Sequence, residues 1–253
     1  MIYGATSKNI NKLTISMTIL SFVGLFFFKF SVTNILISTI SFYILNILGN
    51  WLMLHRYYAH RSFEFKSKII KQLLTGLAVL SGRGSPMGWA YIHRQHHAYS
   101  DTDRDPHSPK TLGYKLFGFN HYKEMESQKM NVFLVKDILS EQQIFIHKYY
   151  MLFILSFILC LGLYSIEILY FAWILPVFFV HLSQNNFNYF SHTHGYKNIE
   201  TTDNSKNNVW LFPILLGEAW HNNHHANPRN FSTSYRKFEL DPLSWFINLV
   251  KIK

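Results

Sequence analysis

Four long apolar segments constrain the fold of this chain more than any other feature. In chain order they cover residues 13–28, 32–54, 149–164 and 166–182. Each is close to the about 20 residues that a helix needs to cross a lipid bilayer. The joins within the first pair and within the second pair are very short, so we expect two helical hairpins. No small-residue cleavage site follows the first segment, which is therefore expected to be a membrane helix and not a signal peptide.

The distribution of basic residues orients these hairpins. Of the 24 lysines and arginines, all except Lys29 lie on the side of the hairpins that also carries the two chain ends. The positive-inside rule places this side in the cytoplasm. The sequence therefore predicts an all-α integral membrane protein with a single domain over residues 1–253. Both termini and a helical cap, formed by residues 55–148 and 183–253, are expected on the cytoplasmic side.

Two explanations of the net charge of +10 remain open. The charge follows from the topological bias together with attraction to anionic lipid head groups, or it forms a docking surface for a phosphate-rich acyl carrier or an acidic electron donor. The membrane segments and the lack of a recognisable binding motif argue against a nucleic-acid partner. The single cysteine, Cys160, excludes an internal disulfide and a cysteine-based metal site.

Nine of the 14 histidines fall in four short clusters on the predicted cytoplasmic side. The clustered histidines are His55, His60, His93, His96, His97, His192, His221, His224 and His225. Histidine is the commonest metal ligand, and nine ligands exceed the three protein ligands typical of one catalytic zinc ion. The sequence therefore predicts two metal ions held close together in the cap.

The spacing within the clusters indicates how the ligands converge. Residues at i, i+3 and i+4 share one helix face, so the triplets that begin at His93 and His221 each point to one side. Asn188 lies one turn before the lone histidine of the third cluster. His55 and His60 are five residues apart, which is about 140° on an ideal α-helix. They reach one site only at a frayed helix end, or else each serves a different metal.

The chemistry of an all-imidazole, two-metal site is limited. The clusters contain no HExxH pattern, which is the zinc-binding motif of many hydrolases. They also contain no Glu-x-x-His pattern, which ferritin-like proteins use. A non-haem di-iron centre that activates oxygen is what remains. Outer groups must orient the imidazoles, and the candidates beside the clusters are Asp101, Asp105, Glu218 and Asn222.

The remaining cap segments and histidines are expected to be structural. Residues 67–81 are predicted to form an amphipathic helix that lies in the membrane interface or packs against the bundle. Residues 211–225 are predicted to form a single last helix that delivers the final histidines. The histidines outside the clusters are expected to be solvated or hydrogen-bonded without a metal; they are His107, His121, His147, His181 and His194.

The clusters and their flanks resemble the membrane-bound fatty acyl desaturases of the stearoyl-CoA desaturase type. The residues that carry the resemblance are HRYYAHRSF (55–63), WAYIHRQHHAYSD (89–101), DPHSP (105–109), GEAWHNNHHANP (217–228) and the Asn188-x-x-x-His192 pair. The match spans roughly residues 50–230, and the combination of three boxes is far more specific than any one of them. The family also has four membrane helices and a site on the cytosolic side.

The resemblance implies an activity and a set of partners. The nine histidines would bind two iron ions, and Asn188 would touch one of them through water. Oxygen would be reduced with electrons from a separate donor, either ferredoxin or cytochrome b5 with a reductase. The product would be a cis double bond, most often at carbon 9. The acyl chain would thread a bent apolar tunnel, for which the candidates are Trp89, Trp220 and Phe187.

Departures from the family pattern leave the acyl carrier open. Animal acyl-CoA members have an arginine where this chain has Tyr91, so acyl-CoA, an acyl carrier protein and a membrane phospholipid all stay possible. Two other functions are weighed. A fatty acyl or alkyl hydroxylase would use the same di-iron centre. A histidine-rich metal-binding or transport protein would need polar positions within its spans, and these spans are nearly free of ionisable groups.

Overall fold

The structure, a computed structural model, describes residues 4–113 and 130–252, and these form helices and loops with only isolated β-bridges. Four continuous helical stretches are long and apolar enough to cross a membrane, which confirms the prediction of four membrane helices. They are α1 (Ser7–Phe27), α2 (Val32–Tyr43) continued by η1 (Ile44–Ala59), α6 (Glu141–Tyr164), and α7 (Ile166–Leu169) continued by η4 (Tyr170–Ile174) and α8 (Leu175–Thr193).

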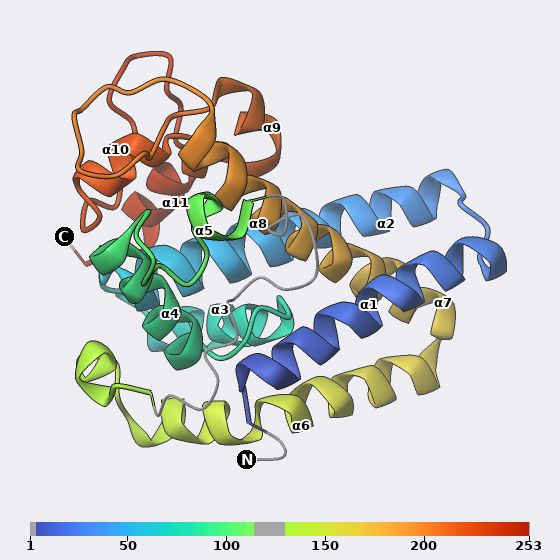
Figure 1. Ribbon diagram of the computed structural model, residues 1–253. Coiled ribbons are helices and arrows are strands. Elements are labelled where there is room, and N and C mark those ends of the chain that lie inside the picture. Colours follow the sequence, from blue (N-terminus) through green and yellow to red (C-terminus); the bar gives the residue numbers. More distant parts are fainter. Residues whose placement is uncertain (1–3, 114–129, 253) are drawn as a thin grey trace.

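The short joins between these helices are stabilised by serines. Ser31 precedes α2 and accepts a hydrogen bond from the Asn34 amide, while Ser165 precedes α7 and accepts one from the Ile168 amide. Both serines are therefore N-caps that satisfy the free amides of the helix that follows. Figure 1 shows the two joins at the same end of the molecule, and Asn34 also donates from Nδ2 to Glu167 across them.

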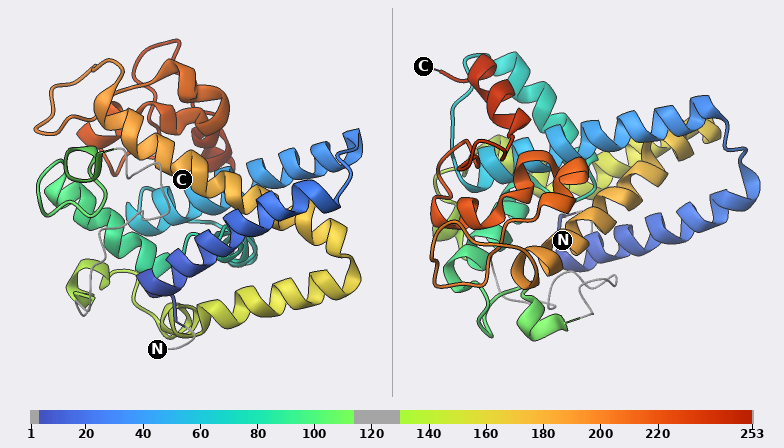
Figure 2. Two further views of the ribbon diagram at one scale, coloured as in Figure 1. Left: turned by 45° about the vertical axis from the view of Figure 1, so that its right-hand side comes forward. Right: turned by 90° about the horizontal axis from the view of Figure 1, so that it is seen from above.

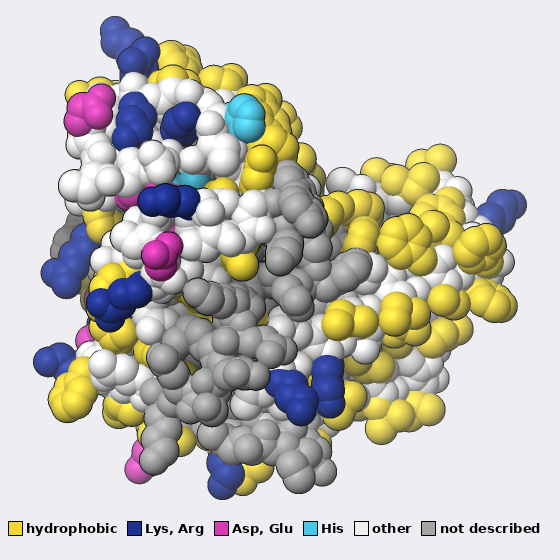
Figure 3. Space-filling model, viewed as in Figure 1, with side chains coloured by type: hydrophobic (Ala, Val, Ile, Leu, Met, Phe, Trp, Pro, Cys, Tyr) yellow, Lys and Arg dark blue, Asp and Glu magenta, His cyan; other side chains and the backbone are white. Residues whose placement is uncertain are grey.

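The helices diverge from these joins and do not pack as closed pairs. Helices α1 and α2 both lie against α8 and η4, while α6 runs along the outside of the bundle (Figures 1 and 2). The surface around the joins is apolar, with Phe26 87% exposed and Leu163 80% exposed. Figure 3 shows hydrophobic side chains gathered over this end, whereas most basic side chains lie toward the opposite end. Such a surface is suited to lipid; which end faces the cytoplasm stays a prediction.

Two of the membrane helices run further toward the cap than their apolar segments indicate. Helix α6 begins at Glu141, and α8 continues to Thr193. The added turns of α8 carry polar side chains that are buried in the cap, including Gln184 and Asn188. Hydropathy does not detect such turns, because their polar groups are satisfied by protein and not by water. The helix-compatible sequence of residues 184–189 does predict that the helix continues toward His192, and this prediction is confirmed.

The cap consists of shorter helices that surround the ends of η1 and α8. They are α3 (Lys68–Leu80), α4 (Pro86–Tyr99), α5 (Pro109–Leu112), η3 (Val132–Val135), η5 (Val209–Leu211), α9 (Phe212–Leu215), η6 (Leu216–Ala219), α10 (His221–Ala226) and α11 (Pro242–Val250). The predicted helix over 67–81 is confirmed as α3, which packs closely against η1. Its place in the membrane interface stays a prediction.

The prediction of one helix over residues 211–225 is wrong. The backbone breaks at Leu216, which has a positive φ of 52°, and again at Trp220. The breaks turn Glu218 inward against Arg56, and the Trp220 ring donates from Nε1 to the Leu240 carbonyl at 2.8 Å. Tertiary contacts of these buried side chains therefore override the local helical pattern.

Candidate metal centre

The first histidine pair is brought together by an unusual helix. The backbone of η1 is a π-helix, and its last turn includes the bond from the His60 amide to the His55 carbonyl at 3.1 Å. Residues five apart share a face when hydrogen bonds run from i+5 to i. His55 and His60 lie in one group at the end of η1, which is the arrangement expected at a helix end and not that of separate metals. The π-helical winding, which was not expected, aligns the two side chains.

The second cluster is held by a well-defined helix start. Ser85 caps α4, with its Oγ accepting from the Gly88 amide at 3.1 Å, and Pro86 occupies the first turn. Proline suits this position because its missing amide hydrogen is not needed there. The Ser85 N-cap fixes where α4 begins, and so it fixes the direction in which His93, His96 and His97 point.

The last cluster depends on a residue that lies outside it. Asn207 accepts hydrogen bonds at Oδ1 from the amides of Asn222 and Asn223, in the first turn of α10. Its Nδ2 also donates to the Asn223 side chain at 3.0 Å. This buried asparagine acts as an N-cap from a distant segment, and it fixes the start of the helix that carries His221, His224 and His225.

All nine clustered histidines meet in two adjacent groups. The five-histidine group comprises His55, His60, His93, His97 and His224. The four-histidine group comprises His96, His192, His221 and His225. The triplet on α4 and the triplet on α10 each contribute to both groups. Each triplet therefore places side chains from one helix face in both histidine groups.

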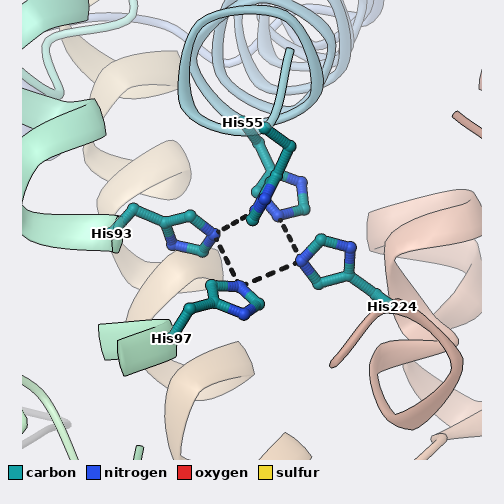
Figure 4. Close-up of side chains that lie close together, drawn as sticks. His55, His93, His97 and His224 are labelled. Carbon is teal, nitrogen blue, oxygen red and sulfur yellow. Dashed lines mark hydrogen bonds between the residues drawn. The ribbon is translucent and has the colours of Figure 1, made fainter. Parts of the chain in front are cut away.

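The ring nitrogens of each group face a common centre. In the five-histidine group, His55 and His224 approach to 3.0 Å between Nε2 atoms, and His60 and His93 to 2.8 Å. Figure 4 shows four of these rings around one point. Ligands at right angles on one metal, with bonds of about 2.1 Å, have donors about 3.0 Å apart. The observed spacing therefore fits a metal ion at the centre of each group.

Burial keeps six of these imidazoles in the form that binds metal. Burial, reinforced by neighbouring histidines, lowers the pKa of His93, His97 and His221 well below its ordinary value. For His225 the pKa falls to about 4, because burial outweighs the opposing effect of Asp203. A neutral imidazole offers a free lone pair, as metal binding requires. Five or four inward-facing nitrogens cannot all be satisfied by one another, and a cation satisfies them together.

Four carboxylates lie against the outer nitrogens of these histidines. Three were predicted: Asp101 lies 3.0 Å from His192 Nδ1, Asp105 lies 2.9 Å from His96 Nδ1, and Glu218 lies 2.9 Å from His55 Nδ1. Such contacts fix the tautomer that presents Nε2 to a metal. Burial alone would raise the pKa of Asp105, but the hydrogen bond from His96 lowers it overall.

The fourth carboxylate, Asp203, was missed by sequence reasoning. Its Oδ2 lies 2.6 Å from His225 Nδ1, and burial, which would raise its pKa, is outweighed by this bond. Asp203 lies in the polar stretch 200–208, which carries the signals of a loop and no histidine. The sequence marks Asp203 only as an acidic residue between the third and last clusters, and it shares this property with Glu200.

Asn222 occupies a different place from the one expected. It is buried beside the ligands, but its Oδ1 accepts from the amides of Asn198 and Ile199, and its Nδ2 donates to the Ile199 carbonyl. Asn222 therefore anchors a loop over α10, and these bonds lead away from the histidine rings.

A small cavity adjoins the five-histidine group. Its lining comprises Arg83, Trp89, Ile92, His93, His107, Gln184 and Asn188. Asn188 accepts at Oδ1 from Gln184 at 3.1 Å, which orients its amide beside the cavity. Its contact with a metal through water stays a prediction.

The three aromatic candidates for an acyl tunnel lie in different surroundings. Trp89 lines the cavity and stacks on His93, with ring centroids 4.6 Å apart. Phe187 meets His221 edge-on at 4.6 Å. Trp220 packs instead against Phe212. Trp89 and Phe187 thus pack directly on rings of the two histidine groups, and the tunnel role of all three stays a prediction.

The histidines outside the clusters fall into two kinds. His107 stacks on His96 at 4.2 Å between ring centroids and lies close enough to join it and Asp105 around an ion. His147 contacts Ser85, His181 contacts Thr14, and His194 contacts Thr193, all outside the two groups. His121 lies outside the described residues.

Comparisons with known proteins agree with this geometry. The model of the fatty acid desaturase family matches residues 33–238. The chain is 30% identical to "Delta-9 acyl-lipid desaturase 2" of Arabidopsis thaliana over 93% of this chain and 77% of the relative. It is 30% identical to "sn-1 stearoyl-lipid 9-desaturase" of Anabaena variabilis, over 88% and 83%. It is also 28% identical to "Hex-5-enoyl-[acyl-carrier protein] acetylenase" of Moorena producens (strain JHB), over 80% and 69%.

Proposed function

The chain belongs to the fatty acid desaturase family, and from this membership we propose that it inserts a cis double bond at carbon 9 of a saturated acyl chain in a membrane lipid. The observation that carries the proposal is the pair of histidine groups beside the ends of membrane helices. Membership makes the chain an oxidoreductase, whereas the metal, the position of the bond and the carrier are parts of the proposal.

The donor set supports two iron ions. Imidazole suits iron, and the described groups offer no thiolate that would favour another chemistry. Two irons held there would supply the one-electron chemistry that reduces dioxygen to water while two hydrogen atoms leave adjacent methylenes. The residues of this chain hold the ions in place, fix the imidazole tautomers through the four carboxylates, and exclude water with Trp89 and Phe187.

The identity of the carrier rests on Tyr91 and on the relatives. Tyr91 is buried, and its hydroxyl accepts a hydrogen bond from Gln95 at 3.1 Å. A tyrosine held in this way does not offer the charge that an arginine would bring to the phosphates of coenzyme A. Two of the relatives carry names that specify acyl-lipid substrates. Lipid-bound acyl chains therefore have more support than acyl-CoA or an acyl carrier protein.

A separate electron donor completes the proposed reaction. The net charge of +10 and the exposed basic side chains on the cap end (Figure 3) suit an acidic donor such as ferredoxin or cytochrome b5. Formation of one double bond consumes two electrons from this donor, in addition to the two that leave the acyl chain with the hydrogen atoms.

The test is expression in a host that lacks desaturases, followed by mass spectrometry of total fatty acids. A new cis monoene at carbon 9 is expected from the unaltered chain and from the His194→Ala variant, which changes a histidine outside the groups. No product is expected from His96→Ala. A hydroxy acid would place the chain with hydroxylases, and product from His96→Ala would contradict the metal assignment.

The carrier is tested separately with purified protein, ferredoxin and a reductase. Labelled stearoyl-phospholipid, stearoyl-CoA and stearoyl-acyl carrier protein are offered in parallel, and the label is followed before any acyl exchange. Conversion of the phospholipid is expected. Conversion of only one of the other two substrates would overturn the proposed carrier while leaving the reaction intact.

A further inference from the structure

The carboxylates around the two histidine groups are distributed unequally. In the four-histidine group, three of the four histidines have a carboxylate at Nδ1: His96 has Asp105, His192 has Asp101 and His225 has Asp203. The described carboxylate against the five-histidine group is Glu218, beside His55. The group with fewer imidazoles thus has the larger negative charge around it.

The difference in negative charge between the surroundings of the two groups is larger than the number of carboxylates indicates. Glu218 accepts from Arg56 Nε at 2.6 Å, so a guanidinium that it shares with Asp241 offsets part of its charge. The three aspartates accept their other hydrogen bonds from neutral groups. For Asp101 these are the Asn204 amide and the Ser108 hydroxyl. For Asp203 they are the amide and hydroxyl of Ser205 and the hydroxyl of Thr201, while Lys197 donates to the Asp203 backbone carbonyl. Neutral donors fix a carboxylate in place without cancelling its charge.

A carboxylate at the outer nitrogen of a histidine makes its inner nitrogen a stronger ligand. Loss of one such partner typically lowers metal affinity by about 10- to 100-fold. Three carboxylates that accept from no lysine or arginine therefore raise the metal affinity of their group more than one carboxylate that is paired with Arg56. The fifth imidazole of the other group acts in the opposite direction, but it is neutral and adds no charge to oppose that of the cation.

We propose that the two metal positions are inequivalent, and that Asp101, Asp105 and Asp203 make the four-histidine position the one that retains its divalent ion more tightly. The five-histidine position is then the labile one. This inference rests on the proposed function, because it assumes that both groups hold metal. It assigns Asp203 to the site as a positioning residue for His225.

The test is the release of ferrous iron from the full-length protein in detergent, without oxygen, into excess of a coloured ferrous chelator. Absorbance reports release directly and requires no turnover. The unaltered protein is expected to lose one equivalent rapidly and one slowly. Iron content by mass spectrometry before and after the rapid phase gives the stoichiometry of each phase.

Single substitutions assign each phase to a position. Asp203→Asn removes a charge while keeping the shape of the side chain, and it is expected to accelerate the slow phase about 10- to 100-fold and leave the rapid phase unchanged. Glu218→Gln is expected to accelerate the rapid phase alone. Asp103→Asn is the matched control, because Asp103 is exposed in the loop between Asp101 and Asp105 and the same charge is lost. Neither phase should change in this variant.

The outcomes separate the inference from the function on which it rests. Release of both equivalents at one rate, or acceleration of the rapid phase by Asp203→Asn, would overturn the inequivalence and leave the di-iron proposal standing. A well-folded protein that binds no iron would overturn both. The unchanged rapid phase in Asp203→Asn serves as an internal check that the variant is folded.

Discussion

Arg56 and Glu218, 162 residues apart in the chain, form a buried ion pair in which Nε donates to Oε1 at 2.6 Å. Arg56 also donates to Asp241 at 2.9 Å, and its side chain is only 2% exposed. The pair joins η1 to the segment before α10. It therefore holds the first and last histidine clusters at a fixed separation.

Replacement of Arg56 by Met should be strongly destabilising. The substitution leaves Glu218 and Asp241 buried without their cation, and loss of one partner of a buried pair costs about 3–5 kcal/mol. Thermal unfolding in detergent measures the change. Glu64→Gln is the control, because it breaks the more exposed pair with Arg61 and should cost at most about 1 kcal/mol. Equal effects of the two substitutions would contradict the role of Arg56.

Replacement of Asn207 by Ala should loosen α10. Two amides in its first turn lose their acceptor, and a lost N-cap together with buried hydrogen bonds costs about 2 kcal/mol. Because α10 carries three histidines, iron content should fall together with the unfolding temperature. Asn204→Ala, which removes an exposed side chain in the same loop, should change neither quantity. Full iron content in Asn207→Ala would show that α10 needs no cap.

Substitution of alanine for glycine should have opposite effects on stability at Gly49 and at Gly76. A Cβ at Gly49 would lie 2.6 Å from the Leu77 carbonyl oxygen, so Gly49→Ala must push α3 away from η1. Overpacking of this kind costs about 1–3 kcal/mol. A Cβ at Gly76 meets no atom within 4 Å, and Gly76→Ala should stabilise α3 by about 0.5–1 kcal/mol. Unfolding of both variants under one condition tests the pair, and a neutral Gly49→Ala would contradict the close contact.

Glu239 should make stability depend on pH. Burial would raise its pKa, but the hydrogen bond from Tyr196 and bonds from the backbone amides of Tyr235 and Arg236 lower it overall. A carboxyl with a depressed folded-state pKa stabilises fully above its ordinary pKa, and this contribution is lost as pH falls through the folded value. Glu239→Gln should therefore cost about 2 kcal/mol at pH 7.

The difference between Glu239→Gln and the unaltered protein should shrink as the pH is lowered below the ordinary carboxyl range. Unfolding at a series of pH values measures it. The exposed Glu200 provides the control, since Glu200→Gln should leave the pH profile unchanged. A difference that stays constant with pH would show that the charge of Glu239 contributes nothing.

The sequence was sufficient for those features that depend on local pattern. Hydropathy identified the four long helices, and histidine spacing identified the triplets at His93 and His221. The candidates chosen because they lie next to a cluster in the sequence include Asp101, Asp105 and Glu218, and each of these contacts a histidine ring. The triplets depend on residues within one or two helical turns of each other. Asp101 and Glu218 were identified by their place beside a cluster, although each contacts a histidine of a distant cluster.

Features set by tertiary contacts could not be predicted. The alignment of His55 with His60 requires π-helical winding, which no spacing rule for α-helices describes. The break at Leu216 depends on where Glu218 and Trp220 find their partners. Asp203 reaches His225, 22 residues further along the chain, only because the intervening η5, α9 and η6 fold so that the two side chains meet. The last two cases depend on contacts between segments whose spacing carries no periodic signal, and the first depends on a local helix type that α-helical spacing rules do not describe.

Both histidine groups contain side chains from α10, and this has a consequence for the order of events during biosynthesis. His55 reaches its neighbour His224 only after 169 further residues have been added, and the four-histidine group needs His225 from the same late helix. All four membrane helices therefore leave the ribosome before either group is complete. A nascent chain can therefore insert its four membrane helices before either group is complete, and neither group can hold an ion with its full set of histidines until α10 has been made.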